Sequence, residues 1–350
     1  MEAFDRKNDI VLFFDFFSQG SQDLYNSFIN SKIEVEAVCI NDDGFLPDGI
    51  VNPFEWFCGD FSKCDKIKGK PLYFNEVPIP DFWEISGTNS EGRVKDFSRD
   101  CAKIFYAEPK HKRYVKVVDW LDENGVARFC DHFNKYGAFY ARTTLNKDGK
   151  RVFKTYFDVN GRDVLVENFV TGGIILNEIN HIQMFKSRTE FLAYFMKKTG
   201  FDKKRLFFNS LSTPFFVSNA LSQNEAGKGD ILFWQETIYD SIPGNMRYIF
   251  DGKATRCAHV IVQDLISYEK LIGLGVKADM LSKLGFVYSF EKENTGMPKA
   301  LICTNTENVE NMNSMFRGCS LLKYINLLLK ICIFFASSVA FVDSFPKSLS

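Results

Sequence analysis

The sequence lacks a large excess of charge of either sign. Its 350 residues contain 43 Lys plus Arg against 44 Asp plus Glu, which gives a formal net charge of −1. A near-neutral chain has no global attraction to nucleic acid, so we expect no nucleic-acid partner. Paired cysteine motifs are also missing, because none of the nine Cys forms a C-x-x-C pair and their number is odd. A chain of this length with 45% apolar residues needs no disulfide bonds, so we expect free thiols.

Sequence patterns that build a reactive centre are absent as well. There is no H-E-x-x-H, no His/Cys cluster at zinc spacing, no G-x-S-x-G and no Walker loop. The four His, at 111, 132, 181 and 259, are far apart in the sequence. Gly273-Leu274-Gly275 follows a predicted helix rather than a strand, which excludes a dinucleotide fingerprint. We therefore expect no catalytic residue, no metal and no cofactor.

Export signals are missing too. No Asn-x-Ser/Thr glycosylation site occurs, and the charged N-terminus precedes an apolar run that is too short for a signal peptide. We therefore expect a cytoplasmic protein.

The first 40 residues have the pattern of a β-α-β unit. Ile10–Phe14 is a short apolar run that suits a strand buried on both faces. Apolar residues at helical spacing follow up to Asn30, and Val35–Ile40 is a second apolar strand. After Arg188 the same alternation returns, with strands at 205–208, 231–234 and 258–262 separated by predicted helices. This pattern predicts a doubly wound, mainly parallel sheet.

The middle of the chain follows a different period. Short alternating runs at 114–120, 127–133, 139–145, 152–157 and 164–170 are interrupted or followed by the turn dipeptides Asn124-Gly125, Asp148-Gly149, Asn160-Gly161 and Gly172-Gly173. Such dipeptides favour type I′ turns between antiparallel strands. We therefore predict an antiparallel β-meander domain, residues 76–185, inserted into a Rossmann-like domain made of residues 8–75 and 186–295.

The last 55 residues change character. Ala300–Thr304 and Asn305–Phe316 read as a strand and helix that start a second Rossmann-like domain at 296–316. From 317 to 350 the composition shifts to Leu, Ile, Phe and Ser, and Ile331–Val342 has no charge. Spanning a bilayer needs about 20 apolar residues. The tail is a segment unrelated to the fold, a buried or partner-covered helix, or a membrane anchor.

Neutral polar residues follow several predicted strands, where doubly wound sheets bind ligands. They suit hydrogen bonding to a polar peptide or a sugar, but they include no nucleophile beside a base. The alternative is that they only cap helices and close turns. For Asp42-Asp43, a metal-binding pair is the less favoured alternative to a turn. The candidate binding residues are Ser18, Gln19, Ser21, Asn41, Asp42, Asp43, Asn209, Ser210, Ser212, Trp234, Gln235 and Glu236.

Several of these segments together resemble one family. They are D-F-F-S-Q-G-S-Q-D-L (15–24), N-D-D-G-F-L-P-D (41–48), N-P-F-E-W-F-C-G (52–59), F-N-S-L-S-T-P-F-F-V-S-N-A-L (208–221), I-L-F-W-Q-E (231–236) and I-P-G-N-M (242–246). The combination is similar to the glycosyltransferase-stabilising proteins, or glycosylation chaperones, of the accessory Sec system in Gram-positive bacteria. The resemblance runs from about residue 8 to 316, and the tail from Arg317 does not share it.

The resemblance implies a fold and a role. The fold would be α/β and GT-B-like, with an inserted antiparallel sheet domain and a truncated second Rossmann-like domain. The protein would be a non-catalytic partner of a peptide O-N-acetylglucosaminyltransferase. It would help to hold a Ser/Thr-rich acceptor, a serine-rich repeat adhesin, before export. We expect the meander to dock on the transferase, with Tyr140, Tyr156 and Phe157 as candidate docking residues.

Two other functions remain open from the sequence. The chain is an active GT-B glycosyltransferase, although such an enzyme holds its nucleotide-sugar mostly in the C-terminal domain, which is largely absent here. Alternatively, it is an adaptor tethered to the membrane by Tyr324–Val342. Peripheral association with the inner face of the cell membrane also remains open.

Overall fold

The computed structural model describes residues 9–30, 33–64, 67, 69–221, 229–254, 256–262, 265–276, 284–289 and 300–303. The chain divides into two compact units. Unit 1 consists of Met1–Val38 and Ala193–Ser350, and unit 2 of Cys39–Leu192. The segment between residues 39 and 75 therefore belongs with the antiparallel sheet in this division, whereas the sequence analysis assigned it to the first Rossmann-like domain.

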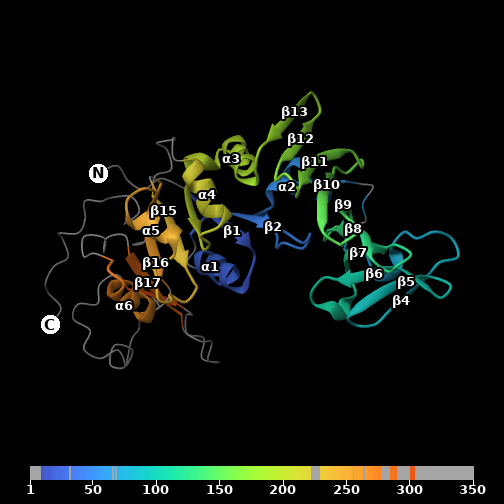
Figure 1. The fold of residues 1–350 in the computed structure, drawn as a ribbon, viewed down its shortest axis with the longest axis horizontal. Coiled ribbons are helices and arrows are strands. Elements are labelled where there is room, and N and C mark those ends of the chain that lie inside the picture. Colours follow the sequence, from blue (N-terminus) through green and yellow to red (C-terminus); the bar gives the residue numbers. More distant parts are fainter. Residues whose placement is uncertain are drawn as a thin grey trace. The chain divides into compact units, whose positions relative to one another are not determined.

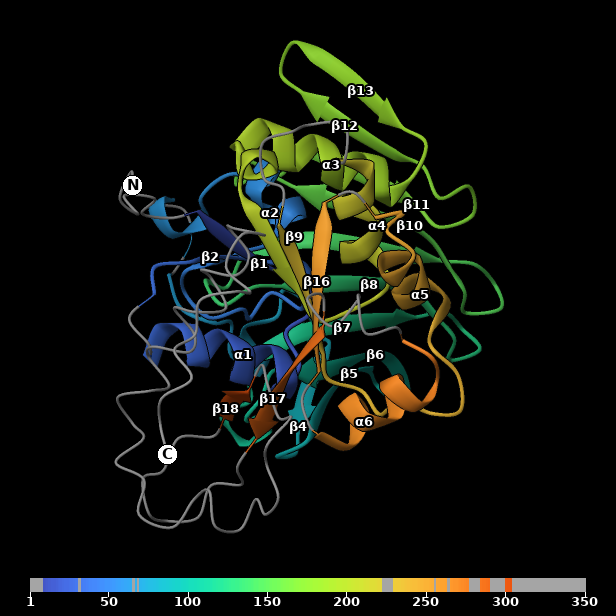
Figure 2. The same cartoon turned by 90° about the vertical axis from the view of Figure 1, so that its left-hand side faces the viewer.

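A mainly parallel sheet with helices forms unit 1 (Figures 1 and 2). The strand order of this sheet is β18-β17-β16-β15-β14-β1-β2-β3, in which β2 continues from unit 1 into unit 2 and β3 (Ile50–Val51) belongs to unit 2. The elements are β1 (Ile10–Phe16), α1 (Gln19–Asn30), β2 (Glu36–Asn41), α3 (Arg188–Thr199), β14 (Arg205–Phe208), α4 (Thr213–Ala220), β15 (Asp230–Trp234), α5 (Gly244–Phe250), β16 (Cys257–Val262), α6 (Leu265–Gly273), β17 (Leu284–Ser289) and β18 (Ala300–Cys303). The predicted strands and helices of this region are confirmed, and α5 and β17 are additions.

The centre of this sheet is the point where the strand order reverses. Ile10–Phe14 and Leu206–Phe208 of β14 are buried, as continuous apolar runs between two helical layers should be. From β1 the chain proceeds to β2 on one side, and later from β14 to β15 on the other. Because parallel crossovers are right-handed, α1 and α4 lie on opposite sides of β1 (Figure 1). The loops after β1 and β14 therefore diverge at this point, where such sheets bind ligands.

Of the second domain predicted to start near residue 296, the structure describes only residues 300–303. Ala300–Cys303 forms β18, which pairs antiparallel with β17 at the edge of the first sheet. A short apolar strand can complete any available sheet edge, and sequence pattern alone cannot say which one. Residues 296–299 and 304–316, and the tail 317–350, lie outside the described residues.

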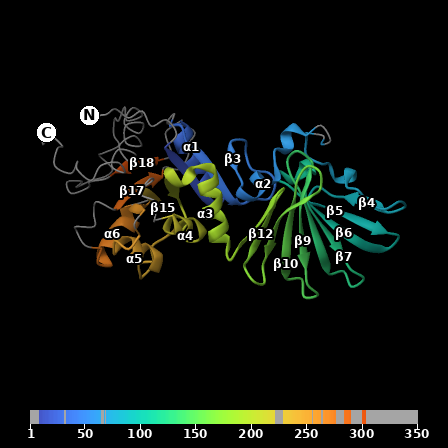
Figure 3. The ribbon, with the colours of Figure 1, turned by 90° about the horizontal axis from the view of Figure 1, so that it is seen from above.

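Unit 2 is built on a ten-stranded antiparallel sheet whose strands follow chain order, so the predicted β-meander is confirmed. Its strands lie between residues 84 and 185, within the predicted 76–185. Figure 3 shows these strands fanning out side by side. The elements are β3 (Ile50–Val51), α2 (Pro53–Cys58), β4 (Glu84–Gly87), β5 (Glu91–Asp96), β6 (Arg99–Tyr106), β7 (Val115–Leu121), β8 (Ala127–Phe133), β9 (Phe139–Leu145), β10 (Arg151–Phe157), β11 (Asp163–Asn168), β12 (Ile174–Glu178) and β13 (His181–Phe185).

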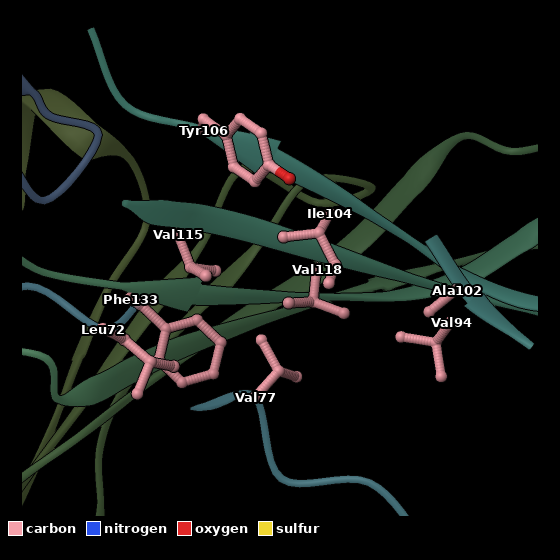
Figure 4. Close-up of a cluster of buried hydrophobic side chains, with 9 residues drawn as sticks. All are labelled: Leu72, Val77, Val94, Ala102, Ile104, Tyr106, Val115, Val118 and Phe133. Atoms are coloured by element: carbon pink, nitrogen blue, oxygen red, sulfur yellow. The ribbon is translucent and has the colours of Figure 1, made fainter. Parts of the chain in front are cut away.

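The two ends of this sheet are covered on opposite faces. Near β5–β7, Leu72 and Val77 pack onto Ile104 and Val118 (Figure 4). Near β10–β12, helix α2 covers the other face, and the ring of Phe54 stacks on Tyr156 with centroids 5.0 Å apart. The two side chains of a cross-strand pair point to the same face of the sheet. The face that carries the Leu72 cluster therefore continues without this cover toward β13, and we call that region the open face.

The predicted turn type is wrong. A type I′ turn needs positive φ at both central residues, but among the described non-glycine residues only Phe82, Phe97 and Arg113 have positive φ. In three hairpins a type I turn precedes a left-handed Gly, as at Gly125 with φ 75°. The reason is an Asp or Asn three residues before the Gly, since Asp122 Oδ1 accepts the N–H groups of Asn124 and Val126. Asn146 and Asp158 do the same in the turns at Gly149 and Gly161.

Candidate functional site

The loops after β1, β14 and β15 meet in unit 1 through a set of neutral hydrogen bonds. Asn209 Nδ2 donates to Ser21 Oγ at 3.0 Å and to Gln235 Oε1 at 2.8 Å. Gln235 Nε2 in turn donates to the carbonyl of Gly20 at 3.1 Å. Ser21 Oγ donates to the Phe16 carbonyl at the end of β1. The structure thus brings together three of the predicted residues from three distant segments, at the carboxyl edge of the sheet.

Gly20 explains how these loops come so close. A Cβ atom at this position would lie 2.5 Å from Gln235 Oε1, so a side chain there would displace the amide. Ser18 completes the group, with its Oγ 3.2 Å from Ser21 Oγ. The cluster contains hydroxyls and amides, which both donate and accept hydrogen bonds, and this chemistry suits a polar, uncharged ligand.

The remaining candidates of unit 1 lie around this cluster or away from it. Ser210 Oγ is 2.9 Å from Ser212 Oγ, and Ser212 Oγ donates to the carboxylate of Asp15, a residue that the sequence analysis did not select. Gln19 is exposed and donates a hydrogen bond to Asp23, and Glu236 is exposed. Trp234 is buried in the core. These residues therefore divide into a rim of side chains and one core residue.

In unit 2, the predicted Asn41 is the last residue of β2, and Asp42 and Asp43 follow it. Asn41 Oδ1 accepts a 2.8 Å hydrogen bond from Arg188, and Asp43 pairs with Lys116 at 3.2 Å. Asp42 Oδ1 accepts the N–H of Gly44 at 2.8 Å, which is the predicted turn geometry. Among the described residues, no group of three or more His, Cys, Asp or Glu could hold a metal ion.

Behind Asp42 lies a group of half-buried titratable side chains that were not predicted from the sequence. Burial and the neighbouring Asp42 hold the pKa of the Glu55 carboxyl well above its usual range, and burial raises the pKa of Asp42 as well. Burial also lowers the pKa of Lys154 on β10 to about 8. No motif marks these residues, because Glu55 and Lys154 are nearly 100 positions apart and only the fold brings them together.

The docking residues predicted for the meander lie in different environments. Tyr140 and Tyr156 are 1% and 4% exposed, so they belong to the core under α2 and offer no surface to a partner. Their selection was wrong because a period-2 pattern does not say which face a helix covers. Phe157 lies on the other side of the sheet, where its ring stacks on Phe139 at 5.0 Å.

The open face carries a group of large apolar and aromatic side chains around one arginine. Arg142 lies 5.4 Å from the ring centroids of both Phe129 and Phe139, and its guanidinium pairs with Asp131 at 2.6 Å. Register places Arg142, Val166, Ile175 and Met184 in one row across β9–β13. Met184 and Ile182 are 73% and 61% exposed. The members are Phe129, Arg142, Phe153, Phe157, Val166, Ile175, Ile182 and Met184, and Trp120 and Phe139 border them where they pack against the Leu72 cluster.

This composition is that of a protein interface. Aromatic residues, Met and Arg are enriched at the centres of interfaces, whereas Lys and Glu are depleted there.

Within the described residues, no helix is long and apolar enough to cross a membrane.

Comparison with known proteins identifies three consecutive domains. Family models for the GtfB N-terminal, middle and third domains match residues 10–57, 83–186 and 188–274. The middle-domain match nearly coincides with β4–β13.

Relatives match over most of the chain. The stabilizing protein GtfB of Streptococcus agalactiae is 45% identical over 313 residues, which are 89% of this chain and 69% of the relative. The GtfB protein of Streptococcus gordonii is 38% identical over 88% of this chain and 68% of its own length.

Solved structures are similar to this chain as well. A chain in the crystal structure of a GtfA/B complex bound to UDP and GlcNAc is 38% identical, with a TM-score of 0.73 over 81% of this chain and 63% of that chain. A structure of accessory secretory proteins 1, 2 and 3 from Streptococcus pneumoniae shares the fold, with a TM-score of 0.61 at 12% identity.

The expected α/β fold with an antiparallel sheet domain is therefore confirmed, as is the family resemblance. This chain belongs to the family of UDP-N-acetylglucosamine–peptide N-acetylglucosaminyltransferase stabilizing proteins.

Proposed function

We propose that this chain is the non-catalytic, stabilising and acceptor-binding subunit of a peptide O-N-acetylglucosaminyltransferase complex. Its relatives carry the name of stabilizing proteins for such a transferase, and a relative was solved in a GtfA/B complex. The open face of unit 2 is the observation that carries the proposal, because an aromatic surface around a paired arginine needs a protein partner to exclude water from it. The partner is the catalytic transferase subunit.

The acceptor is a Ser/Thr-rich polypeptide, a serine-rich repeat adhesin, modified in the cytoplasm before export. The neutral cluster of Ser21, Asn209 and Gln235 supports this part, since hydroxyls and amides can hydrogen-bond a peptide backbone without a net charge. Peripheral association with the cell membrane stays a prediction.

Co-expression with the catalytic subunit tests the docking. In the double variant Ile175→Glu/Met184→Glu, two carboxylates replace neighbouring apolar side chains of the open face, which are paired in register. Burying a charge in an interface is costly, so co-purification should be lost at micromolar concentration. Tyr239→Glu is the matched control, because Tyr239 in unit 1 is also 73% exposed but lies on no part of the open face.

Retention of the transferase by the double variant would contradict the docking surface. An active transferase is the less favoured alternative. Transfer of N-acetylglucosamine from UDP-GlcNAc by the purified chain alone would overturn the non-catalytic assignment.

A further inference from the structure

A cavity of about 150 Å³ lies in unit 2 between the loop after β2 and the first turn of α2. Three carboxyl side chains line it, those of Asp42, Asp48 and Glu55, and Leu46 and Ile50 contribute apolar wall. A space of this size has room for several water molecules or a short polar side chain.

The loop that forms the cavity is held in place by Lys135. Its Nζ donates to the Leu46 carbonyl at 2.8 Å and to Asp48 Oδ1 at 2.5 Å, and its backbone N–H donates to the Gly44 carbonyl. Gly44 has φ +87°, and a Cβ atom there would lie 2.6 Å from the Phe133 carbonyl. The cavity is therefore preformed, which lowers the entropic cost of binding a ligand.

Asn52 fixes the opposite wall. Its Oδ1 accepts the N–H groups of Phe54 and Glu55, and its Nδ2 donates to the carbonyls of Cys39 and Ile40 at 3.0 Å. The start of α2 is thus tied to the end of β2, and Glu55 is held at the cavity.

One atom of this wall lacks a partner. Glu55 Oε1 is buried and makes no hydrogen bond with any described residue. Buried polar atoms are nearly always hydrogen-bonded, and leaving one unsatisfied costs stability. An oxygen in this state at a polar cavity is positioned to accept a hydrogen bond from a ligand.

The charges around the cavity nearly cancel. Lys135 pairs with Asp48, and Asp42 and Glu55 lie within hydrogen-bonding reach of each other. Burial and the neighbouring Asp42 raise the pKa of Glu55 and so favour its neutral form, while Lys154 opposes the charge of Asp42. Neither a cation nor an anion is selected, so a neutral group that both donates and accepts hydrogen bonds fits best.

We propose that this cavity is a binding subsite for a hydroxyl group of the acceptor, with Glu55 Oε1 as the acceptor of the hydroxyl hydrogen bond. The subsite rests on the proposed function. The hydroxyl belongs to a Ser or Thr side chain or to an N-acetylglucosamine already attached to it, and binding makes and breaks no covalent bond.

Titration calorimetry on the full chain tests the subsite. The probes are a synthetic Ser/Thr-rich peptide, the same peptide with every Ser and Thr replaced by Ala, and free N-acetylglucosamine. Glu55→Ala removes the accepting oxygen and should weaken binding of the hydroxyl probe about tenfold. Glu55→Gln keeps an oxygen at that position and should bind within about twofold of the unchanged chain. Glu84→Ala, an exposed carboxylate of β4 in the same unit, is the matched control.

A second variant separates binding from folding. Leu46→Trp should fill the cavity from its wall and weaken binding while the carboxyls remain, and thermal unfolding checks that each variant is folded. The proposal would be overturned if Glu55→Ala left the binding of both the Ser/Thr-rich peptide and the free sugar unchanged. Glu55-dependent binding of the free sugar would identify the sugar hydroxyl as the source, and binding of the peptide alone would identify Ser or Thr.

This result is independent of docking on the transferase. The double variant Ile175→Glu/Met184→Glu should lose the transferase and keep Glu55-dependent binding of the probe. If the transferase co-purifies with the unchanged chain but no probe binds to it, the subsite fails while the docking proposal stands.

Discussion

The two units bury charged side chains in different ways. In unit 1, Asp230 and Arg256 are 0% and 1% exposed and form a two-point pair with N···O distances of 3.0 and 3.2 Å. Arg256 also donates to the carbonyls of Asp202 and Lys204, and Asp230 accepts from Ser218 and from the backbone of Leu206. The group joins β14, β15 and α4, with hydrogen-bond partners for both charges.

Unit 2 leaves some of its buried and half-buried polar groups without a full set of partners. Arg188 Nε lies 3.2 Å from Glu167 Oε1. The charge of Lys154 is attracted to the same Glu167 carboxylate. Glu55 Oε1 and the Tyr140 hydroxyl have no hydrogen-bond partner among the described residues. A fully satisfied network stabilises a fold, whereas an unsatisfied one costs free energy and needs another reason to be kept. The Asp230–Arg256 pair of unit 1 therefore has a structural role, whereas Glu55 of unit 2 is a candidate for binding a ligand.

The largest effect should follow from breaking the pair in unit 1. Arg256→Met leaves Asp230 buried without its cation, and the free energy of unfolding should fall by about 3–5 kcal/mol. The double variant Arg256→Met/Asp230→Leu removes both charges and should recover part of this loss. Urea denaturation measures both. A double variant that is less stable than the single one would contradict this account.

Removing the arginine of the Arg188–Glu167 pair in unit 2 should lower the free energy of unfolding by a smaller amount. In Arg188→Met, Glu167 keeps the nearby charge of Lys154, so a loss of about 1–2 kcal/mol is expected. If Arg188→Met and Arg256→Met lowered the free energy of unfolding equally, the two units would not differ in how they stabilise their charged side chains.

An intermediate effect should appear on acidification. Burial lowers the pKa of His132 to about 3, against about 6.5 in an unfolded chain. Between these values the unfolded state binds a proton that the folded state does not, so stability falls as the pH falls. From pH 7 to pH 5 this residue should cost about 2 kcal/mol of unfolding free energy. In His132→Gln that contribution should be absent, and urea denaturation at both pH values measures it. Identical falls in both proteins would refute the assignment.

The smallest effect should be a gain. Phe97, between β5 and β6, has φ 54° and is 90% exposed, so a bulky side chain adopts a left-handed backbone without burial in return. Phe97→Asn should raise the unfolding free energy by about 0.5–1 kcal/mol, because Asn tolerates this conformation better. Phe105→Asn, on strand β6, should instead lose stability. A loss in Phe97→Asn would show that the Phe ring packs on its surroundings.

Some elements could be predicted because the signal was local. The continuous apolar run at Ile10–Phe14 and the alternation of 127–133 and 139–145 give β1, β8 and β9 within two residues. Helix α2 was missed because six residues show too little periodicity, although Asn52 followed by Pro53 is a helix start. The turn type was missed because the deciding side chain, as at Asp122, lies outside the Asn-Gly pair.

The candidate sites divide in the same way. Ser21, Asn209 and Gln235 were found because each follows a predicted strand, and parallel strands end at one edge. Glu55, Lys135 and Lys154 follow no such rule. Their importance arises from packing α2 and the β2–β3 loop against the sheet.

The sequence by itself determined the alternation of elements, the family and the residues at the ends of the parallel strands, because period, turn residues and motifs are local properties. Only the tertiary structure decided which face of the antiparallel sheet is covered. That choice buried Tyr140 and Tyr156, exposed Met184 and left Glu55 beside a cavity. The physical reason is that the side chains of a strand alternate between two faces of the sheet. Which face becomes buried depends on where a helix from a distant part of the sequence packs.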